Sequence, residues 1–210
     1  MTNLFNNGAG NGFAPCLFYA KAPEKICGEL YPNLRQEEIE ECVDNSLKIE
    51  KFYAWKLLEI AVNEYIGLDF NKINFEKSSN GKWLCDEFCF SISHSAGVVA
   101  VCISENAVGV DCQEIKPVKD GMENKILTAR EKELLSTLEG AEREDFLLSA
   151  WCKKECLLKH SGEGALHASK RETVGVEFFN KKIEIDGKGY LFFACGEGIT
   201  QNLTLRKIEF

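Results

Sequence analysis

The order of apolar and polar positions predicts a pair of short strands near the middle of the chain. The segment SISHSAGVVAVCISENAVGVDC, from Ser91 to Cys112, holds two apolar runs joined by the polar turn Ser104-Glu105-Asn106, a pattern typical of neighbouring strands. One end of this pair carries His94 between two serines, and the other end carries Asp111. Packing alone gives no reason for a histidine and an acid at these places, so we expect both to serve a functional site.

The segments before and after this strand pair have apolar residues at helical spacing. From Leu34 to about Ile66, apolar residues recur every three to four positions, with Gly67 as a stop signal, which predicts one helix. Its apolar face holds Phe52, Trp55, Leu57 and Leu58. We expect two further helices at residues 128–138 and 143–160, the second leading to a glycine-rich turn at Gly162 and Gly164.

The remaining apolar segments have the character of strands. They lie at residues 15–20, 173–179, 181–187, 189–195 and 202–210. Asn80-Gly81 is a turn signal ahead of the central strand pair. Each half of the chain therefore holds helix before strands, with no low-complexity linker between them. This order predicts an α+β fold with antiparallel strand pairs packed on helices.

Composition narrows the class of protein. With 210 residues, 45% hydrophobic, the chain is long and apolar enough to bury a core. Its longest apolar run, Gly97 to Ile103, is too short to span a bilayer, and the N-terminal residues lack the pattern of a signal peptide. We therefore expect a cytoplasmic protein without membrane contact, whose ten cysteines are reduced thiols, since no CxxC pair occurs.

The net charge of −8 argues against nucleic-acid binding, which needs clustered lysine and arginine. An anionic ligand would have to be held by a local group of basic residues. Salt screening makes this feasible, because the field of the whole chain is largely hidden beyond about 10 Å at 0.1 M salt.

The segment WCKKECLLKHSGEG places candidate functional residues on the second long helix. Trp151, Glu155 and Lys159 lie at positions i, i+4 and i+8, on one stripe, and Lys154 borders it. In isolation this pattern also fits an amphipathic helix with a surface ion pair. Together with the strand residue Asp111, however, Glu155 would form an oxygen-lined site suited to Mg²⁺, which shares its coordination with substrate phosphate. The flanking lysines would neutralise that phosphate.

A second stripe of the same helix offers another interpretation. Cys152, Cys156 and His160 also follow at i, i+4 and i+8 and could ligate zinc with one more residue, and a cysteine–histidine nucleophile pair is possible in principle. Nothing nearby in the sequence completes either site. We favour buried thiols on the core face of the helix.

The three motifs ISHS, VGVDCQ and WCKKECLLK, in this order, resemble the 4'-phosphopantetheinyl transferases, specifically the larger, surfactin-synthetase-type class. They span roughly residues 80–166. The resemblance implies Mg²⁺-dependent transfer of 4'-phosphopantetheine from coenzyme A to a serine of an acyl or peptidyl carrier protein, releasing adenosine 3',5'-bisphosphate. Mn²⁺ would also suit such ligands. It further implies a monomer built as a pseudo-twofold pair of α+β halves, residues 1–114 and 115–210.

The resemblance also assigns roles to residues of this chain. Asp111, Gln113 and Glu155 would hold the metal, and Glu155 and Lys159 would be catalytic, as base and as stabiliser of the departing bisphosphate. The expected coenzyme A contacts are Lys51, Lys82, Ser93, His94, Lys154 and Lys159. Glu114 should face away from Gln113 along the strand.

Two positions depart from the family pattern. Gln113 replaces a second acid, and Trp83 replaces a proline beside Lys82. Two other functions stay open on the sequence: a catalytically inactive, coenzyme-A-binding regulatory protein, and a metal-dependent pyrophosphate hydrolase.

Overall fold

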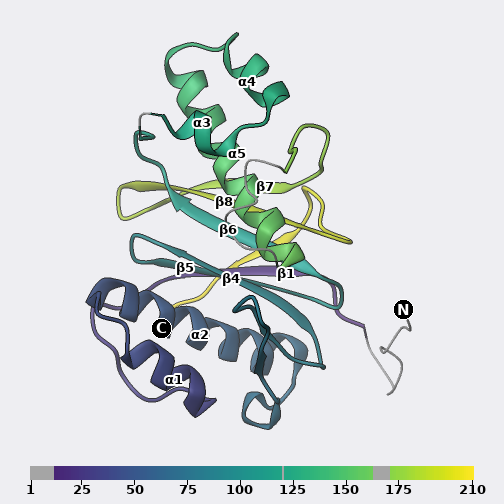
Figure 1. The fold of residues 1–210 in the computed structure, drawn as a ribbon. Coiled ribbons are helices and arrows are strands. Elements are labelled where there is room, and N and C mark those ends of the chain that lie inside the picture. Colours follow the sequence, from purple (N-terminus) through teal and green to yellow (C-terminus); the bar gives the residue numbers. More distant parts are fainter. Residues whose placement is uncertain (1–11, 120, 163–170) are drawn as a thin grey trace.

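Two β-sheets lie face to face between two long helices in the computed structural model of the chain (Figure 1). The structure describes residues 12–119, 121–162 and 171–210, so Gly164 and the first 11 residues lie outside the described part. The first sheet has the order β4 (Cys89–Ser95), β5 (Val98–Ser104), β1 (Cys16–Lys21), β9 (Thr204–Lys207), and the second has the order β6 (Val108–Glu114), β8 (Lys188–Gly196), β7 (Phe179–Ile185). A small hairpin joins β2 (Glu76–Lys77) to β3 (Trp83–Leu84).

The described residues also form helices beside these sheets. They are α1 (Asn33–Glu40), α2 (Asn45–Ala61), α3 (Met122–Ile126), α4 (Ala129–Leu135) and α5 (Gly140–Ser161), with a π-helical turn at Val62–Ile66 and a 3₁₀ turn at Phe70–Lys72. Helix α2 lies against the first sheet and α5 against the second (Figure 1). The α+β class expected from the sequence is confirmed.

The single helix expected from Leu34 to Ile66 is in fact two helices and a π-helical turn. The break falls before Asp44, whose carboxylate accepts a hydrogen bond from the backbone N–H of Leu47 at 2.9 Å and so begins α2. The expected apolar face of α2 is confirmed, since Phe52, Trp55, Leu57 and Leu58 are all buried. Helix α5 ends where the sequence indicated, at Gly162, which adopts the left-handed conformation with φ 73°.

The central strand pair expected between Ser91 and Cys112 is in fact three strands. A two-residue turn at Ala96-Gly97, with φ 47° and 83°, separates β4 from β5. Alanine has a low propensity for turns, so the sequence gave no clear signal for a turn at these two residues. Strands β5 and β6 then enter different sheets, because β5 pairs with β1 and β4 while β6 pairs with β8.

One further strand expectation changes in the structure. Residues 173–178 form a loop, and β7 begins only at Phe179. The expected boundary between residues 114 and 115 does not separate the two sheets. Strand β6, before that boundary, belongs to the second sheet, and β9 returns from the end of the chain to pair in parallel with β1. The division into halves at this boundary and the pseudo-twofold relation between them both stay predictions.

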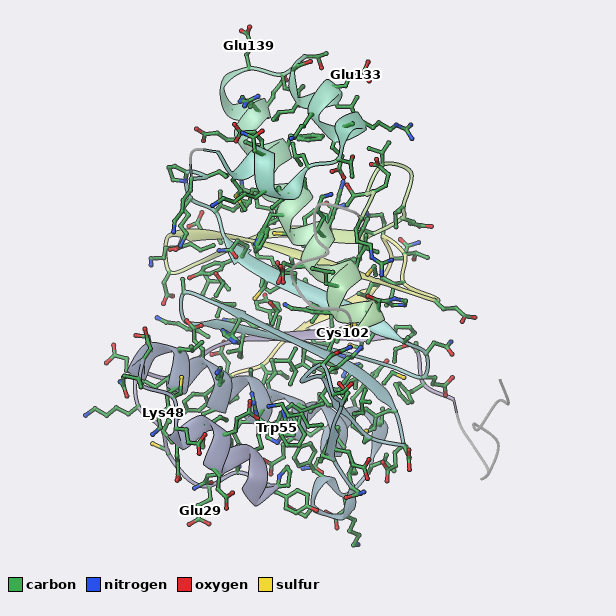
Figure 2. All side chains as sticks on the ribbon, viewed as in Figure 1. Glu29, Lys48, Trp55, Cys102, Glu133 and Glu139 are labelled. Carbon is green, nitrogen blue, oxygen red and sulfur yellow. The ribbon has the colours of Figure 1, made fainter. Side chains whose placement is uncertain are left out.

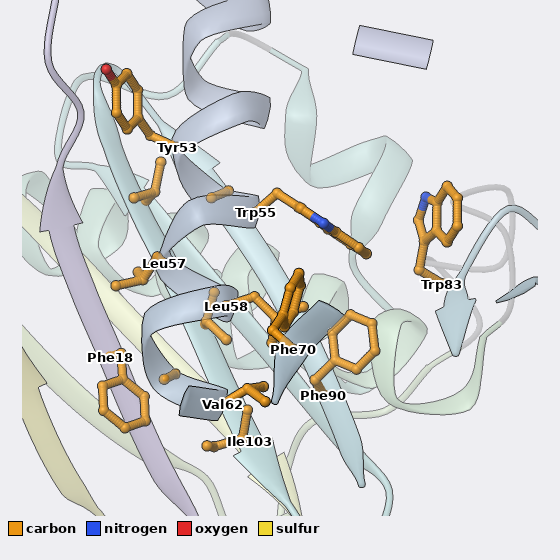
Figure 3. Packing of buried hydrophobic residues seen from close by; sticks show 14 of the residues in the cluster. Phe18, Tyr53, Trp55, Leu57, Leu58, Val62, Phe70, Trp83, Phe90 and Ile103 are labelled. Atoms are coloured by element: carbon orange, nitrogen blue, oxygen red, sulfur yellow. The ribbon is translucent and has the colours of Figure 1, made fainter. Parts of the chain in front are cut away.

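The core under α2 is rich in aromatic rings (Figure 3). Trp55 contacts the rings of Phe70, Trp83 and Phe90 edge to face, and its indole N–H donates to the carbonyl of Tyr31 at 2.5 Å. Such ring pairs add about 0.5–1.5 kcal/mol each beyond simple burial. This packing fixes α2 against the strands that carry the functional site.

A second apolar layer joins the two sheets. Leu17, Val98 and Cys102 of the first sheet meet Val110 and Phe192 of the second. In Figure 2, Trp55 and Cys102 lie inside the molecule, whereas Glu29, Lys48, Glu133 and Glu139 project outward. All ten cysteines are free thiols, six of them buried. Within the described residues, no helix is long and apolar enough to cross a membrane.

Candidate active site

Three serines of β4 attach the first sheet to the open edge of β6. The side chains of Ser91, Ser93 and Ser95 accept hydrogen bonds from the backbone N–H groups of Val110, Cys112 and Glu114, at 3.0, 3.1 and 3.1 Å. Alternate residues of a strand share one face, so the sequence S-x-S-x-S presents three hydroxyls to alternate amides of the neighbouring edge strand. We call these six residues the serine seam. It brings β4 and β6 side by side.

Ser93, Asp111 and Lys159 meet at this seam. The ammonium of Lys159 contacts Oδ1 of Asp111 at 2.8 Å and the hydroxyl of Ser93 at 2.9 Å, and the Ser93 hydroxyl lies 2.8 Å from the same carboxylate oxygen. Burial alone would lower the pKa of Lys159, but Asp111 outweighs it and the pKa lies above its usual value. The cluster therefore holds a lysine cation at the acid.

Glu155 stands one helical turn before Lys159. No hydrogen bond or ion pair within the described ranges holds its carboxylate, and it lines a cavity of about 270 Å³ together with Asp111, Gln113 and Trp151. Burial first, and the Asp111 charge second, raise the pKa of Glu155, while Lys159 opposes the rise. Two acids thus face one small space, as the sequence predicted.

The hydrogen bonding of Asp111 and Gln113 indicates whether these residues suit a divalent cation. Oδ2 of Asp111 is buried and has no hydrogen-bond partner among the residues that the structure describes, although leaving such an atom unpaired is unfavourable. Gln113 donates its side-chain N–H to Ser95 at 3.1 Å, which leaves the amide oxygen as the atom able to ligate. Two carboxylates and an amide oxygen are donors that Mg²⁺ accepts, so the residues fit.

Close packing of α5 on β6 sets the distance between the two acids. Gly109 lies two residues before Asp111, and a Cβ there would stand 2.0 Å from the carbonyl oxygen of Cys156. Only glycine allows this approach. It explains why a glycine precedes the acid in the motif VGVDCQ.

His94 lies beside this cluster and faces a second, adjoining cavity. This cavity has a volume of about 330 Å³, and its lining includes Lys51, Lys82, His94, Glu155 and Lys159. Nδ1 of His94 is 2.8 Å from a carboxylate oxygen of Glu50 on α2. The structure therefore brings together most of the residues predicted to contact coenzyme A.

Lys82 lines the cavity and also forms hydrogen bonds to the C-terminal end of α5. Its ammonium donates to the backbone carbonyls of Lys159 and His160, at 2.6 and 3.4 Å. These are terminal carbonyls of α5, where a cation is favoured. Burial lowers the pKa of Lys82.

Lys154 does not lie with the other predicted ligand contacts. Its side chain is 0% exposed, and its ammonium forms an ion pair with Glu131 at 2.6 Å and donates to the carbonyl of Arg171. Adjacent residues of a helix differ by about 100° in direction, so Lys154 and Glu155 face different sides of α5. Lys154 connects α5 to α4 and does not reach the cavities.

Other expectations on this helix and strand are met. The thiols of Cys152 and Cys156 are buried in the core, and that of Cys156 donates to the carbonyl of Phe193 at 3.2 Å. Glu114 faces away from the cavity, where it pairs with Lys116 and Lys188.

Sequence reasoning missed two residues of the site. Glu50 has no neighbouring motif, and only its position one turn before the apolar face of α2 could have suggested it. Arg35 is buried on the wall of the larger cavity, over the rings of Trp55 and Trp83 at 5.3 and 6.0 Å, with an ion pair to Glu38. Its Nε has no hydrogen-bond partner among the described residues.

Comparison with known proteins agrees with this geometry. Residues 107–202, which carry Asp111, Glu155 and Lys159, match the 4'-phosphopantetheinyl transferase superfamily. Through this stretch, slightly less than half of its length, the chain is similar to that superfamily.

Curated relatives carry the same family name. The 4'-phosphopantetheinyl transferase psf-1 of Bacillus pumilus is 27% identical over 138 residues, which cover 64% of this chain and 56% of the relative. HetI of Nostoc sp. is 26% identical, with 51% and 49% covered, and Sfp of Bacillus subtilis is 22% identical, with 63% and 57% covered. The chain spans about half the length of the curated relatives it matches.

Proposed function

We propose that this protein transfers 4'-phosphopantetheine from coenzyme A to a serine hydroxyl of an acyl or peptidyl carrier protein. The observation that carries the proposal is the meeting of Asp111, Glu155 and Lys159 at the border between two cavities. The smaller cavity offers acids for a cation, and the larger one offers basic side chains for phosphate groups. The superfamily match supports the same reaction.

The larger cavity has the chemistry to bind the nucleotide part of coenzyme A. Lys51 and Lys82 lie on its wall, and His94 and Lys159 stand where it meets the smaller cavity. Cationic side chains of this kind bind phosphate through charge-assisted hydrogen bonds. We place the adenosine bisphosphate there and the pyrophosphate beside Asp111.

Asp111 and Glu155 would hold Mg²⁺, with Gln113 as a neutral third donor. When bound, this ion would neutralise the pyrophosphate and help the leaving group to depart. The unpaired Oδ2 of Asp111 supports this assignment. With two acids instead of three, the site would carry less negative charge than the usual family pattern.

The reaction then needs a base and a cation from the chain. The serine oxygen of the carrier forms a bond to the phosphorus that bears pantetheine, and the bond from that phosphorus to the bridging oxygen of the pyrophosphate breaks. Glu155 takes the hydroxyl proton, a role that typically contributes about 10²–10⁴-fold. Lys159 stabilises the negative charge on the departing adenosine 3',5'-bisphosphate.

We also propose that the enzyme works in the cytoplasm as a monomer. The ten free thiols support a reducing compartment. Because the protein has a net charge of −8, docking of an acidic carrier protein would rely on local lysines and apolar contacts.

The test is the intact mass of an apo carrier protein after incubation with the protein, coenzyme A and Mg²⁺, with and without a chelator. We expect a gain of one phosphopantetheine that the chelator abolishes. Glu155→Gln should abolish the gain while coenzyme A still binds. Glu144→Gln, an exposed position on the same helix, should leave it intact.

Two outcomes would contradict the proposal. Cleavage of coenzyme A by water without carrier modification would indicate a pyrophosphate hydrolase. Binding of coenzyme A without reaction on any carrier tested would indicate a regulatory binding protein, with Gln113 as the first residue to examine.

A further inference from the structure

Glu50 connects helix α2 to the edge of the site. One of its carboxylate oxygens lies 2.8 Å from Nδ1 of His94, and the other accepts the backbone N–H of Gly97 at 2.6 Å. The side chain of Glu50 is 12% exposed and that of His94 is 27% exposed. One carboxylate therefore holds both the histidine ring and the turn that follows it.

The direction of the bond to His94 follows from the ionisation of Glu50. Burial opposes ionisation, but the hydrogen bonds from His94 and Gly97 outweigh it and hold the pKa of Glu50 below its ordinary value. An ionised carboxylate only accepts hydrogen bonds. Nδ1 of His94 must therefore carry a proton, and Nε2 is the ring nitrogen left for a ligand.

A neutral ring in this tautomer would present a lone pair at Nε2, which repels a phosphate oxygen. A protonated ring would present an N–H and a positive charge, which attract it. The arrangement is thus suited to an anion only when the ring is imidazolium.

Other charges border the same cavities, and apart from Glu155 they are engaged elsewhere or carry the same sign as the ring. Glu38 is paired with Arg35 and Lys77, and Asp111 is paired with Lys159. The remaining charged lining residues are Lys51, Lys82 and Glu155. Among the described residues, Glu50 is the acid in contact with the His94 ring.

We propose that Glu50 is a positioning residue that orients the His94 ring through Nδ1 so that, in its imidazolium form, Nε2–H is directed at an anionic phosphate group of the substrate. This inference rests on the proposed function, because it assumes that the cavity binds coenzyme A. Glu50 itself does not contact the substrate. It acts through the ring of His94.

Glu50→Gln separates this role from support of the turn. The Gly97 amide still requires an oxygen, so the glutamine NH₂ faces Nδ1 of His94 and donates to it. The ring proton then moves to Nε2, and the imidazolium loses its carboxylate partner. We expect coenzyme A to bind about tenfold more weakly by calorimetry, with an unchanged unfolding midpoint. Glu59→Gln, which makes the same change on α2 at an ion pair with Lys56 outside both cavities, should bind normally.

A double variant and a spectrum complete the test. If Glu50 acts through the ring, adding Glu50→Gln to His94→Gln should not weaken binding further. Imidazole ¹⁵N–¹H spectra of the ligand-free protein, recorded where the ring is neutral and assigned by loss of the signal in His94→Gln, should show the proton at Nδ1 in the wild type and at Nε2 in Glu50→Gln.

An unchanged tautomer, or an equal loss of affinity in the His94→Gln background, would overturn the proposal. If the wild type fails to bind coenzyme A, the proposed function fails with the ligand part of this inference. The spectra still decide whether Glu50 sets the tautomer.

Discussion

Gly109 offers the sharpest test of how the fold builds the site. A methyl group there would lie 2.0 Å from the carbonyl oxygen of Cys156 and 2.9 Å from the backbone nitrogen of His160. Ordinary contact begins near 3.4 Å, so Gly109→Ala must move α5 away from β6 by about 1.4 Å. Glu155 and Lys159 lie on the stretch of α5 that would move. Their distances to Asp111 would then increase.

This displacement has two measurable consequences. Overpacking of this kind typically costs about 1–3 kcal/mol, and a displacement of about 1 Å at reacting groups can lower the rate about 100-fold. We therefore expect Gly109→Ala to lower the free energy of unfolding in urea by about 1–3 kcal/mol. We expect the rate of carrier-protein modification to fall about 100-fold.

The control is a second glycine of the same sheet. A Cβ at Gly189 in β8 would meet side-chain atoms of Ile115, the nearest at 3.1 Å, and a side chain can rotate away where a helix backbone cannot. Gly189→Ala should therefore stay close to the wild type in both assays. Wild-type stability and rate in Gly109→Ala would refute the conclusion that the close approach of α5 to β6 sets the site geometry.

Three further predictions concern stability, pH and thiol reactivity. Burial opposes ionisation of Glu131, but hydrogen bonds from Lys154 and Thr173 hold its pKa below 4.5. Its stabilising effect should thus be complete above pH 4.5 and be lost as the pH falls through the lower folded value. Glu131→Gln should cost about 3–5 kcal/mol at pH 7 and flatten the acid side of a urea-midpoint profile. A destabilisation equal at all pH values would contradict this. Lys82→Met should lower unfolding stability by about 1 kcal/mol, measured by urea denaturation, because α5 loses its C-terminal cation; an unchanged midpoint would argue for a ligand role alone. Iodoacetamide followed by peptide mass analysis should label the exposed Cys27 well before the buried thiols, and early labelling of a core cysteine would disagree with the packing described.

The sequence predicted local structure well where one period dominated. The apolar face of α2 follows from spacing alone, and Glu155 and Lys159 of the predicted stripe on α5 both line the smaller cavity. Lys154 failed as a ligand contact because a shift of one residue turns a helical side chain by about 100°. The position of Lys154 next to Glu155 in the sequence therefore did not predict the direction of its side chain.

The sequence could not predict which strands become neighbours. The approach of β4 to β6 depends on the turn at Ala96-Gly97 and on the pairing of β8 with β6. Strands β6 and β8 lie far apart in the sequence. The contact from Glu50 to His94 likewise depends on how α2 packs on the first sheet. These are tertiary features, and no local pattern encodes them.

The serine seam has a consequence for how such a site can diversify. Its hydroxyls occupy the odd-numbered positions of β4, while Ile92 and His94 occupy even-numbered positions that line the cavities. Ile92 and His94 therefore lie on the face of β4 opposite the seam hydroxyls, although Ser91 and Ser93 also border the cavities. A substitution at Ile92 would change the wall of both cavities while the three hydrogen bonds of the serine seam remain, so the shape of the cavities can vary independently of the join between the sheets.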